Sequence, residues 1–331
     1  MRPRGVWFGC IGLLLTLGFL PVNPALCQVA KVRVVASIVP LADFCRQIGG
    51  DRVDVEVFIP PGASPHSFEP SPGALANLAQ AKVLVYNGAG LEPWVGRFLA
   101  ALGDHKPALV EAAQGIELIQ EVPKQLAGLE VGETGHHQSG DYGKAKQGVR
   151  ESNSQRTSHA AEVGNPHIWL DPILVQDICR RIAAVLAQVD SPHQTFYEAN
   201  LNHYVAELAA LHERIAARTA AFRIKEYIGF HPSFSYFARR YQLREVGVLE
   251  AAPGREPTPR ALAGIVQAIK CYGIRVIFSE PQFSPRLAQA IARDTGVKVL
   301  MLDPIGGRLP YGENYLKLMQ YNLETMAQAM K

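Results

Sequence analysis

The sequence predicts an α/β protein with two lobes, each built on a parallel sheet, joined by one long rigid helix. Strand-like and helix-like segments alternate in two series, and a long helical segment separates the two series. Such alternation is typical of parallel sheets covered by helices. The chain is also long enough to divide its core, because chains of roughly 300 residues usually form two domains.

The first series covers residues 28–190 and predicts the N-terminal lobe. Its β-branched segments favour strands, and the segments between them have apolar residues at helical spacing. The expected strands are residues 32–38, 53–59 and 82–86, and the expected helices are residues 41–48 and 72–80. A polar segment, residues 130–164, interrupts this lobe with Gly, Ser, Gln, Glu and Lys. That composition predicts a mobile surface loop.

Residues 191–223 predict the linking helix, because their apolar residues recur mostly at spacings of three and four. Ser191 and Pro192 suit a cap and a first turn. A single helix of this length would act as a stiff strut between the lobes. The alternative is two shorter helices with a bend, although no Pro or Gly after Pro192 requires one.

The second series covers residues 224–331 and predicts the C-terminal lobe. It repeats the pattern of the first series, with short apolar segments separated by helical spacing. The expected strands are residues 227–230, 243–249, 275–279 and 298–302.

The first 27 residues have the pattern of a secretory signal peptide. Arg2 and Arg4 precede the uncharged apolar residues 6–20, and a small residue at each end of residues 25–27 offers a cleavage site. A membrane anchor is the alternative, but the apolar run is shorter than the roughly 20 residues of a spanning helix. We therefore expect an exported, periplasmic protein. A lipid anchor on Cys27 is a second alternative, which the bulky Leu26 disfavours.

Charge and cysteine content exclude several classes of partner and site. Loss of Arg2 and Arg4 lowers the formal charge from +3 to +1, which argues against a nucleic-acid partner. Three cysteines remain after residue 27 without C-x-x-C spacing, so neither a thiolate metal site nor a disulfide framework is indicated. We expect buried, small apolar residues at Cys45, Cys179 and Cys271, with at most one bridge.

Four candidate ligands follow strand ends or lie in proline-flanked loops: His66, His167, His231 and Asp303. Ligands of open α/β sheets bind beyond the carboxyl ends of the strands, so these side chains could meet in the cleft between the lobes. Three imidazoles and one carboxylate suit four-coordinate Zn²⁺ better than Mn²⁺ or Mg²⁺, which favour sites rich in carboxylates. Each histidine taken alone is more often structural than a ligand.

Four segments together resemble the zinc- and manganese-binding receptors of ABC transporters. They read PHSFEP at 65–70, NPHIWLDP at 165–172, HPSFSYF at 231–237 and FSEPQF at 278–283. The resemblance covers the whole chain after the leader. It implies two lobes joined by a rigid helix, a metal ion between them, and delivery of that ion to a membrane permease.

The resemblance also implies roles for single residues. His66, His167, His231 and Asp303 match the ligand positions, and Glu280 matches a residue that hydrogen-bonds to a ligand. The third position resembles Glu in manganese-binding members, so His231 favours zinc, with Mn²⁺ as the alternative. Some zinc-binding members have water in place of the last carboxylate. We expect a monomer that takes no small organic substrate.

Other functions and sites have competing interpretations. The loop histidines His136, His137 and His159 suit either a weak collecting site for zinc or plain solvent exposure. A zinc hydrolase would need an open coordination position and a general base, for which Glu280 would be the candidate. Four protein ligands would instead close the shell, and no helical base motif is present, so we expect no enzyme. Adhesion, described for some relatives, would leave the ligand pattern unexplained.

Overall fold

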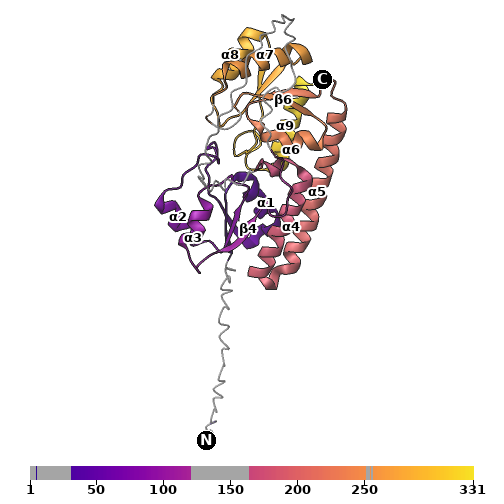
Figure 1. Cartoon of the computed structure of the whole chain (residues 1–331). Helices are drawn as coiled ribbons and strands as arrows, with labels where there is room; N and C mark the ends of the chain where they lie inside the picture. The colour runs from indigo at the N-terminus through magenta and orange to yellow at the C-terminus, as the bar shows by residue number, and fades with distance from the viewer. Residues whose placement is uncertain (1–4, 6–30, 121–163, 251–253, 255) are drawn as a thin grey trace, which may run out of the picture. The chain divides into compact units, whose positions relative to one another are not determined.

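The structure is a computed structural model that describes residue 5 and residues 31–120, 164–250, 254 and 256–331 (Figure 1). From Lys31 onward the chain forms one compact unit. The predicted signal peptide with Cys27 lies outside the described residues. So do residues 130–163 of the predicted polar loop, with His136, His137 and His159.

The first series of elements forms a parallel sheet with the strand order β2-β1-β3-β4. This confirms the predicted parallel sheet and adds a fourth strand, β4, which the sequence analysis did not name. The strands are β1 (Val32–Ala36), β2 (Val53–Val57), β3 (Val83–Tyr86) and β4 (Ala108–Glu111), and the helices among them are α1 (Val39–Gly49), α2 (Pro72–Leu78) and α3 (Val95–Ala101).

The second series forms a parallel sheet of equivalent order, β6-β5-β7-β8. All four strands lie where the sequence places them, within one or two residues at each end. They are β5 (Glu226–Gly229), β6 (Arg244–Val248), β7 (Val276–Ser279) and β8 (Lys298–Met301), and their helices are α6 (Ser235–Arg240), α7 (Pro259–Tyr272), α8 (Arg286–Thr295) and α9 (Tyr315–Ala329).

Two long helices connect the two series: α4 (Pro172–Val189) and α5 (Gln194–Ala220). They pack side by side (Figure 1). The long helix is continuous over 27 residues, but it begins three residues later than predicted. Residues Ser191–His193 form a separate 3-10 turn instead, and the Ser191 side chain does not cap α5.

The apolar core is divided unequally between the two sheets. A large cluster fills the space around the first sheet, α1, α4 and α5, and it continues into α6 and α9. A smaller cluster packs the second sheet against α7 and α8. Helix α9 follows the second sheet in the chain but packs on α1 and α5. The end of the chain therefore ties the second series to the core of the first.

The fold shows the burial of the three cysteines and the character of the described helices. Cys45 and Cys179 are buried and free, as predicted, but Cys271 is exposed, which corrects the expectation that all three are buried. Cys271 lies in the last turn of α7 on a side that faces solvent, whereas Ile265, Ala268 and Ile269 form the buried side. Within the described part of the chain, no helix has the length and apolar character needed to cross a membrane.

Candidate metal centre

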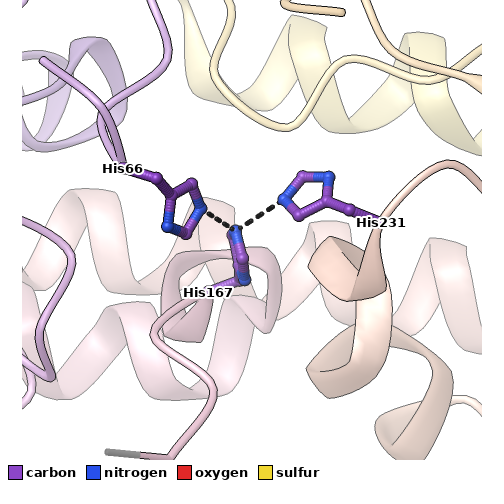
Figure 2. Close-up of side chains that lie close together, drawn as sticks. All are labelled: His66, His167 and His231. Atoms are coloured by element: carbon purple, nitrogen blue, oxygen red, sulfur yellow. Dashed lines mark hydrogen bonds between the residues drawn. The ribbon is translucent and has the colours of Figure 1, made fainter. Parts of the chain in front are cut away.

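Three of the predicted ligands converge from separate parts of the chain (Figure 2). His66 lies in the loop between β2 and α2, and His167 precedes the 3-10 turn Ile168–Leu170 that leads into α4. His231 follows β5 directly before Pro232. The first two belong to the first series and the third to the second series, so the site draws on both sheets.

The reactive nitrogens of these imidazoles point at one another. The Nε2 atom of His167 lies 3.2 Å from Nε2 of His66 and 3.1 Å from Nε2 of His231 (Figure 2). Two nitrogens bound tetrahedrally to one Zn²⁺ at about 2.05 Å would lie about 3.3 Å apart. The two distances from His167 are therefore close to an edge of a zinc coordination tetrahedron, and the ligand atoms of all three histidines lie within 4.8 Å of one another.

The tautomer of His167 is fixed by Asn165. The backbone N–H of His167 donates to Oδ1 of Asn165 at 2.9 Å, and Nδ1 of the imidazole lies 2.8 Å from the same oxygen. Because an amide oxygen only accepts, Nδ1 carries the proton and Nε2 keeps its lone pair. His167 is thus prepared to bind a cation through Nε2.

His231 is prepared in the same way by a buried carboxylate. Its Nδ1 lies 2.7 Å from Oε1 of Glu280, and Ser233 Oγ donates to the same oxygen at 2.9 Å. The ring of Phe283 packs edge-on against the imidazole, with the ring centroids 5.1 Å apart. A carboxylate on Nδ1 orients a histidine and makes its other nitrogen a better ligand.

Asn165 also links the two histidines through the backbone. Its Nδ2 donates to the carbonyl of Pro232 at 2.6 Å, and its own carbonyl accepts from the Tyr236 hydroxyl at 2.8 Å. Pro232 directly follows His231, so one side chain contacts both ligand segments. The sequence pattern does not by itself assign a role to Asn165 or Ser233. Their places within NPH and HPS were the available signal, since polar residues beside a ligand often orient it.

Burial favours the neutral form of His66 and His167. His167 and His231 are only 3% and 4% exposed, and His66 is partly buried. Burial, and then the charge of His231, lowers the pKa of His66 to about 4. The same two causes, in the same order, hold the pKa of His167 well below its usual value, with a further contribution from His66. Neutral imidazole is the form that binds metal.

The structure does not bring Asp303 into this group of three. Its carboxylate is completely buried and accepts four hydrogen bonds instead. Oδ1 accepts from Gln282 Nε2 and from the backbone N–H groups of Ile305 and Gly306, while Oδ2 accepts from the Tyr311 hydroxyl at 2.5 Å. Binding of a metal by Asp303 would break some of these bonds, and its role as fourth ligand stays a prediction.

Two further acidic or histidine side chains have other tasks. Asp171 Oδ1 accepts from the N–H of Ile173 and so caps α4, and Oδ2 pairs with Arg240 at 2.8 Å. His212 is partly buried beside the Tyr241 ring. Its Nδ1 lies 3.2 Å from the Tyr241 hydroxyl.

Comparison with known proteins relates this geometry to a family. The chain is 29% identical to the high-affinity zinc uptake system protein ZnuA of Bacillus subtilis, over 91% of this chain and 88% of that protein. It superposes on a crystal structure of ZnuA with a TM-score of 0.74 and 30% identity, covering 91% of this chain and all of that one.

A second structural relative is described as combining two activities. The laminin-binding protein Lmb of Streptococcus agalactiae, described as bifunctional with adhesin and metal-transporting activity, is 28% identical. It matches with a TM-score of 0.71 over 91% of this chain and all of that chain. The sequence profile of one family, the periplasmic component A of zinc-uptake complexes, matches residues 34–329. The chain belongs to this family of zinc-uptake components.

Proposed function

We propose that this chain captures Zn²⁺ with His66, His167 and His231 and delivers it to the permease of an ABC transporter. The convergence of the three Nε2 atoms within zinc-binding distance is the observation that carries the proposal. Two of these nitrogens have their lone pairs fixed by Asn165 and Glu280, so the site is organised before the ion arrives.

The donor set supports zinc over manganese. Imidazole nitrogen is a common ligand for Zn²⁺, whereas Mn²⁺ favours sites rich in carboxylate oxygen. No carboxylate joins the group of three among the described residues. Manganese binding is the alternative within the same family. A fourth position is left for Asp303, after rearrangement, or for water.

We further propose that the chain is a carrier and not a hydrolase. Glu280 is the candidate base that the sequence offers, and its Oε1 is on the Nδ1 side of the His231 ring. A metal bound at Nε2 would lie on the opposite side of that ring, beyond reach of this carboxylate for a proton from metal-bound water. The exported location rests on the predicted signal peptide, residues 1–27, and we expect a periplasmic monomer.

A competitive titration tests the site directly. The protein is stripped of metal and titrated with Zn²⁺ and, in parallel, with Mn²⁺ against a chromophoric chelator. We expect tight one-to-one binding of Zn²⁺ and weak binding of Mn²⁺. Tighter binding of Mn²⁺ would move the proposal to manganese transport, and the absence of tight binding for both ions would contradict the proposed ligand set.

A further inference from the structure

One loop outside the metal centre presents an apolar side chain to solvent. Leu309 is 92% exposed, whereas the other exposed large hydrophobic residues that the structure describes are about 40% exposed or less. Arg308 and Pro310 on either side of it are also exposed. Single exposed leucines are common on protein surfaces, so Leu309 alone indicates nothing.

The loop is held in place at its base. An isolated antiparallel bridge joins Arg308 to Gly312, and the N–H of Gly307 donates to the carbonyl of Gly312 at 2.7 Å. Tyr311 is buried between them and donates its hydroxyl to Asp303. Leu309 therefore sits on an ordered turn, and a partner would lose little loop entropy on binding it.

A cavity of about 520 Å³ opens beside this turn. The cavity is wide open to solvent, and its lining includes Pro310 and Tyr311 of the turn, Lys317 and Tyr321 of α9, and Arg214 of α5. The rings of Tyr311 and Tyr321 pack together with their centroids 4.9 Å apart. Tyrosine and arginine around a concave surface are the residue types that dominate binding energy at protein interfaces.

The charged side chains that line the cavity are cationic. Arg214, Arg308 and Lys317 are exposed, and in the described part of the chain none of them forms an ion pair. Of the acidic residues close to them in the chain or fold, Glu313 pairs with Arg46 and Glu324 with Arg218, whereas Glu213, directly before Arg214, is exposed. No acidic side chain of the described residues lines the cavity. The surface therefore complements a negatively charged partner.

The same loop contacts the metal-binding part of the chain. A methyl group at Gly307 would lie 2.7 Å from Pro61, which belongs to the loop that carries His66. At the other end, Tyr311 holds Asp303, the predicted fourth ligand. The turn that carries Leu309 is therefore linked by packing to the His66 loop and by a hydrogen bond to Asp303.

We infer that Arg214, Arg308, Leu309 and Lys317 form a docking patch for an acidic segment of the transporter's membrane subunit. The inference rests on the proposed function, which requires such a partner. An apolar side chain of that segment would fill the cavity, Leu309 would insert into the subunit, and acidic side chains would pair with the three cations. A small anion would neutralise the cations but leave Leu309 in water, which favours a protein partner.

Zinc uptake by whole cells tests the patch. Cells of the source organism that lack this chain are complemented with the full chain or its variants, and uptake of radioactive Zn²⁺ is measured. The variants are Leu309→Ser and the double charge reversal Arg214→Glu with Lys317→Glu. The matched control is Lys270→Glu with Lys298→Glu, which reverses two exposed lysines on α7 and β8. Zinc affinity of each purified variant is measured against the chelator.

We expect both patch variants to lower the rate of zinc uptake at least tenfold while zinc affinity stays unchanged, and the control to behave as the unaltered chain. Normal uptake by the patch variants would overturn the docking inference and leave the proposed function intact. Uptake that does not depend on the chain, or lack of zinc affinity in the unaltered protein, would overturn both. A membrane surface would be the partner instead if the unaltered chain sedimented with phosphatidylglycerol vesicles at physiological salt and the patch variants did not.

Discussion

Each sheet has a buried carboxyl group in the segment that follows one of two corresponding strands, β3 and β7, and the two groups are used differently. In their strand orders, β1 corresponds to β5 and β3 to β7. Ser37 follows β1 and donates to Glu92 at 2.6 Å, and Glu92 comes after β3. His231 follows β5 with its Nδ1 2.7 Å from Glu280, which comes directly after β7.

The difference lies in what each carboxyl group holds. Glu92 also accepts from the N–H groups of Asn87 and Gly88, so both of its oxygens stabilise the local backbone. Glu280 holds the imidazole of His231, and its second oxygen is buried without a hydrogen-bond partner among the described residues. A buried carboxyl group therefore stabilises the backbone where its donor is Ser37, and orients a predicted metal ligand where its donor is His231.

Removal of the His231 imidazole, the donor to Glu280, should have the largest effect on zinc affinity. We expect His231→Ala to weaken Zn²⁺ binding about a thousandfold or more, because it removes one of three ligands and leaves Glu280 buried without its partner. The chelator titration measures this affinity. His212→Ala is the control, because His212 lies beside Tyr241 on α5 and away from the three nitrogens. Equal affinity in both variants would contradict the ligand assignment.

Glu92, the carboxyl group of the first sheet, should affect the pH dependence of folding stability and not zinc affinity. Burial raises the pKa of Glu92 from 4.5 to about 7, against the hydrogen bonds from Ser37, Asn87 and Gly88. Between pH 4.5 and 7 the folded state then binds the proton that the unfolded state has lost. The resulting stability is fully present below pH 4.5 and is lost as the pH rises through 7, by about 3 kcal/mol.

The variant Glu92→Gln isolates this contribution, because glutamine stays neutral at every pH. Urea unfolding at pH 5 and pH 8 measures the free energy of unfolding in both proteins. We expect the drop in stability between these pH values to be smaller in Glu92→Gln by about 2–3 kcal/mol, with zinc affinity unchanged. An identical drop in the two proteins would mean that Glu92 is ionised throughout.

Substitution of Glu280, the corresponding carboxyl group of the second sheet, should lower zinc affinity. Glu280→Gln keeps the size of the side chain and an oxygen for His231, but removes the charge that makes the imidazole a better ligand. We expect zinc affinity to fall roughly 10- to 100-fold, which is typical for partners of metal ligands. The titration is paired with urea unfolding of the metal-free protein. A loss of affinity no larger than in Glu92→Gln would remove the distinction between the two sheets.

The sequence predicted every described strand except β4 from local patterns, and it predicted the three converging histidines from their places after strands or in loops together with the family resemblance. Strand segments such as residues 227–230 carry their own apolar pattern, and His231 stands directly after one of them. The roles of Asn165 and Asp303 depend instead on distant partners, because Pro232 and Tyr311 reach them only in the folded chain. The start of α5 was also missed, since Ser191 and Pro192 suit a 3-10 turn as well as a cap.

The smallest effect on zinc affinity is expected at Asp303. Its carboxylate can either accept hydrogen bonds within the fold or bind the metal ion, and the two roles compete. Its two oxygens accept from Gln282, from two backbone N–H groups and from Tyr311, and each bond would oppose transfer of the carboxylate to a metal. We therefore expect Asp303→Asn to lower zinc affinity less than tenfold and to lower the stability of the metal-free protein.

The variant Tyr311→Phe is the matched control, because it frees Oδ2 of Asp303 while keeping the ring against Tyr321. If Asp303 joins the metal when Oδ2 is released, Tyr311→Phe should bind zinc more tightly than the unaltered chain, and Asp303→Asn should cancel that gain. If zinc affinity is the same in all three proteins, the carboxylate of Asp303 belongs with that of Glu92, as part of the framework. A loss of zinc affinity in Asp303→Asn as large as that in His231→Ala would instead place Asp303 among the ligands. Its hydrogen bonds would then break when the ion binds.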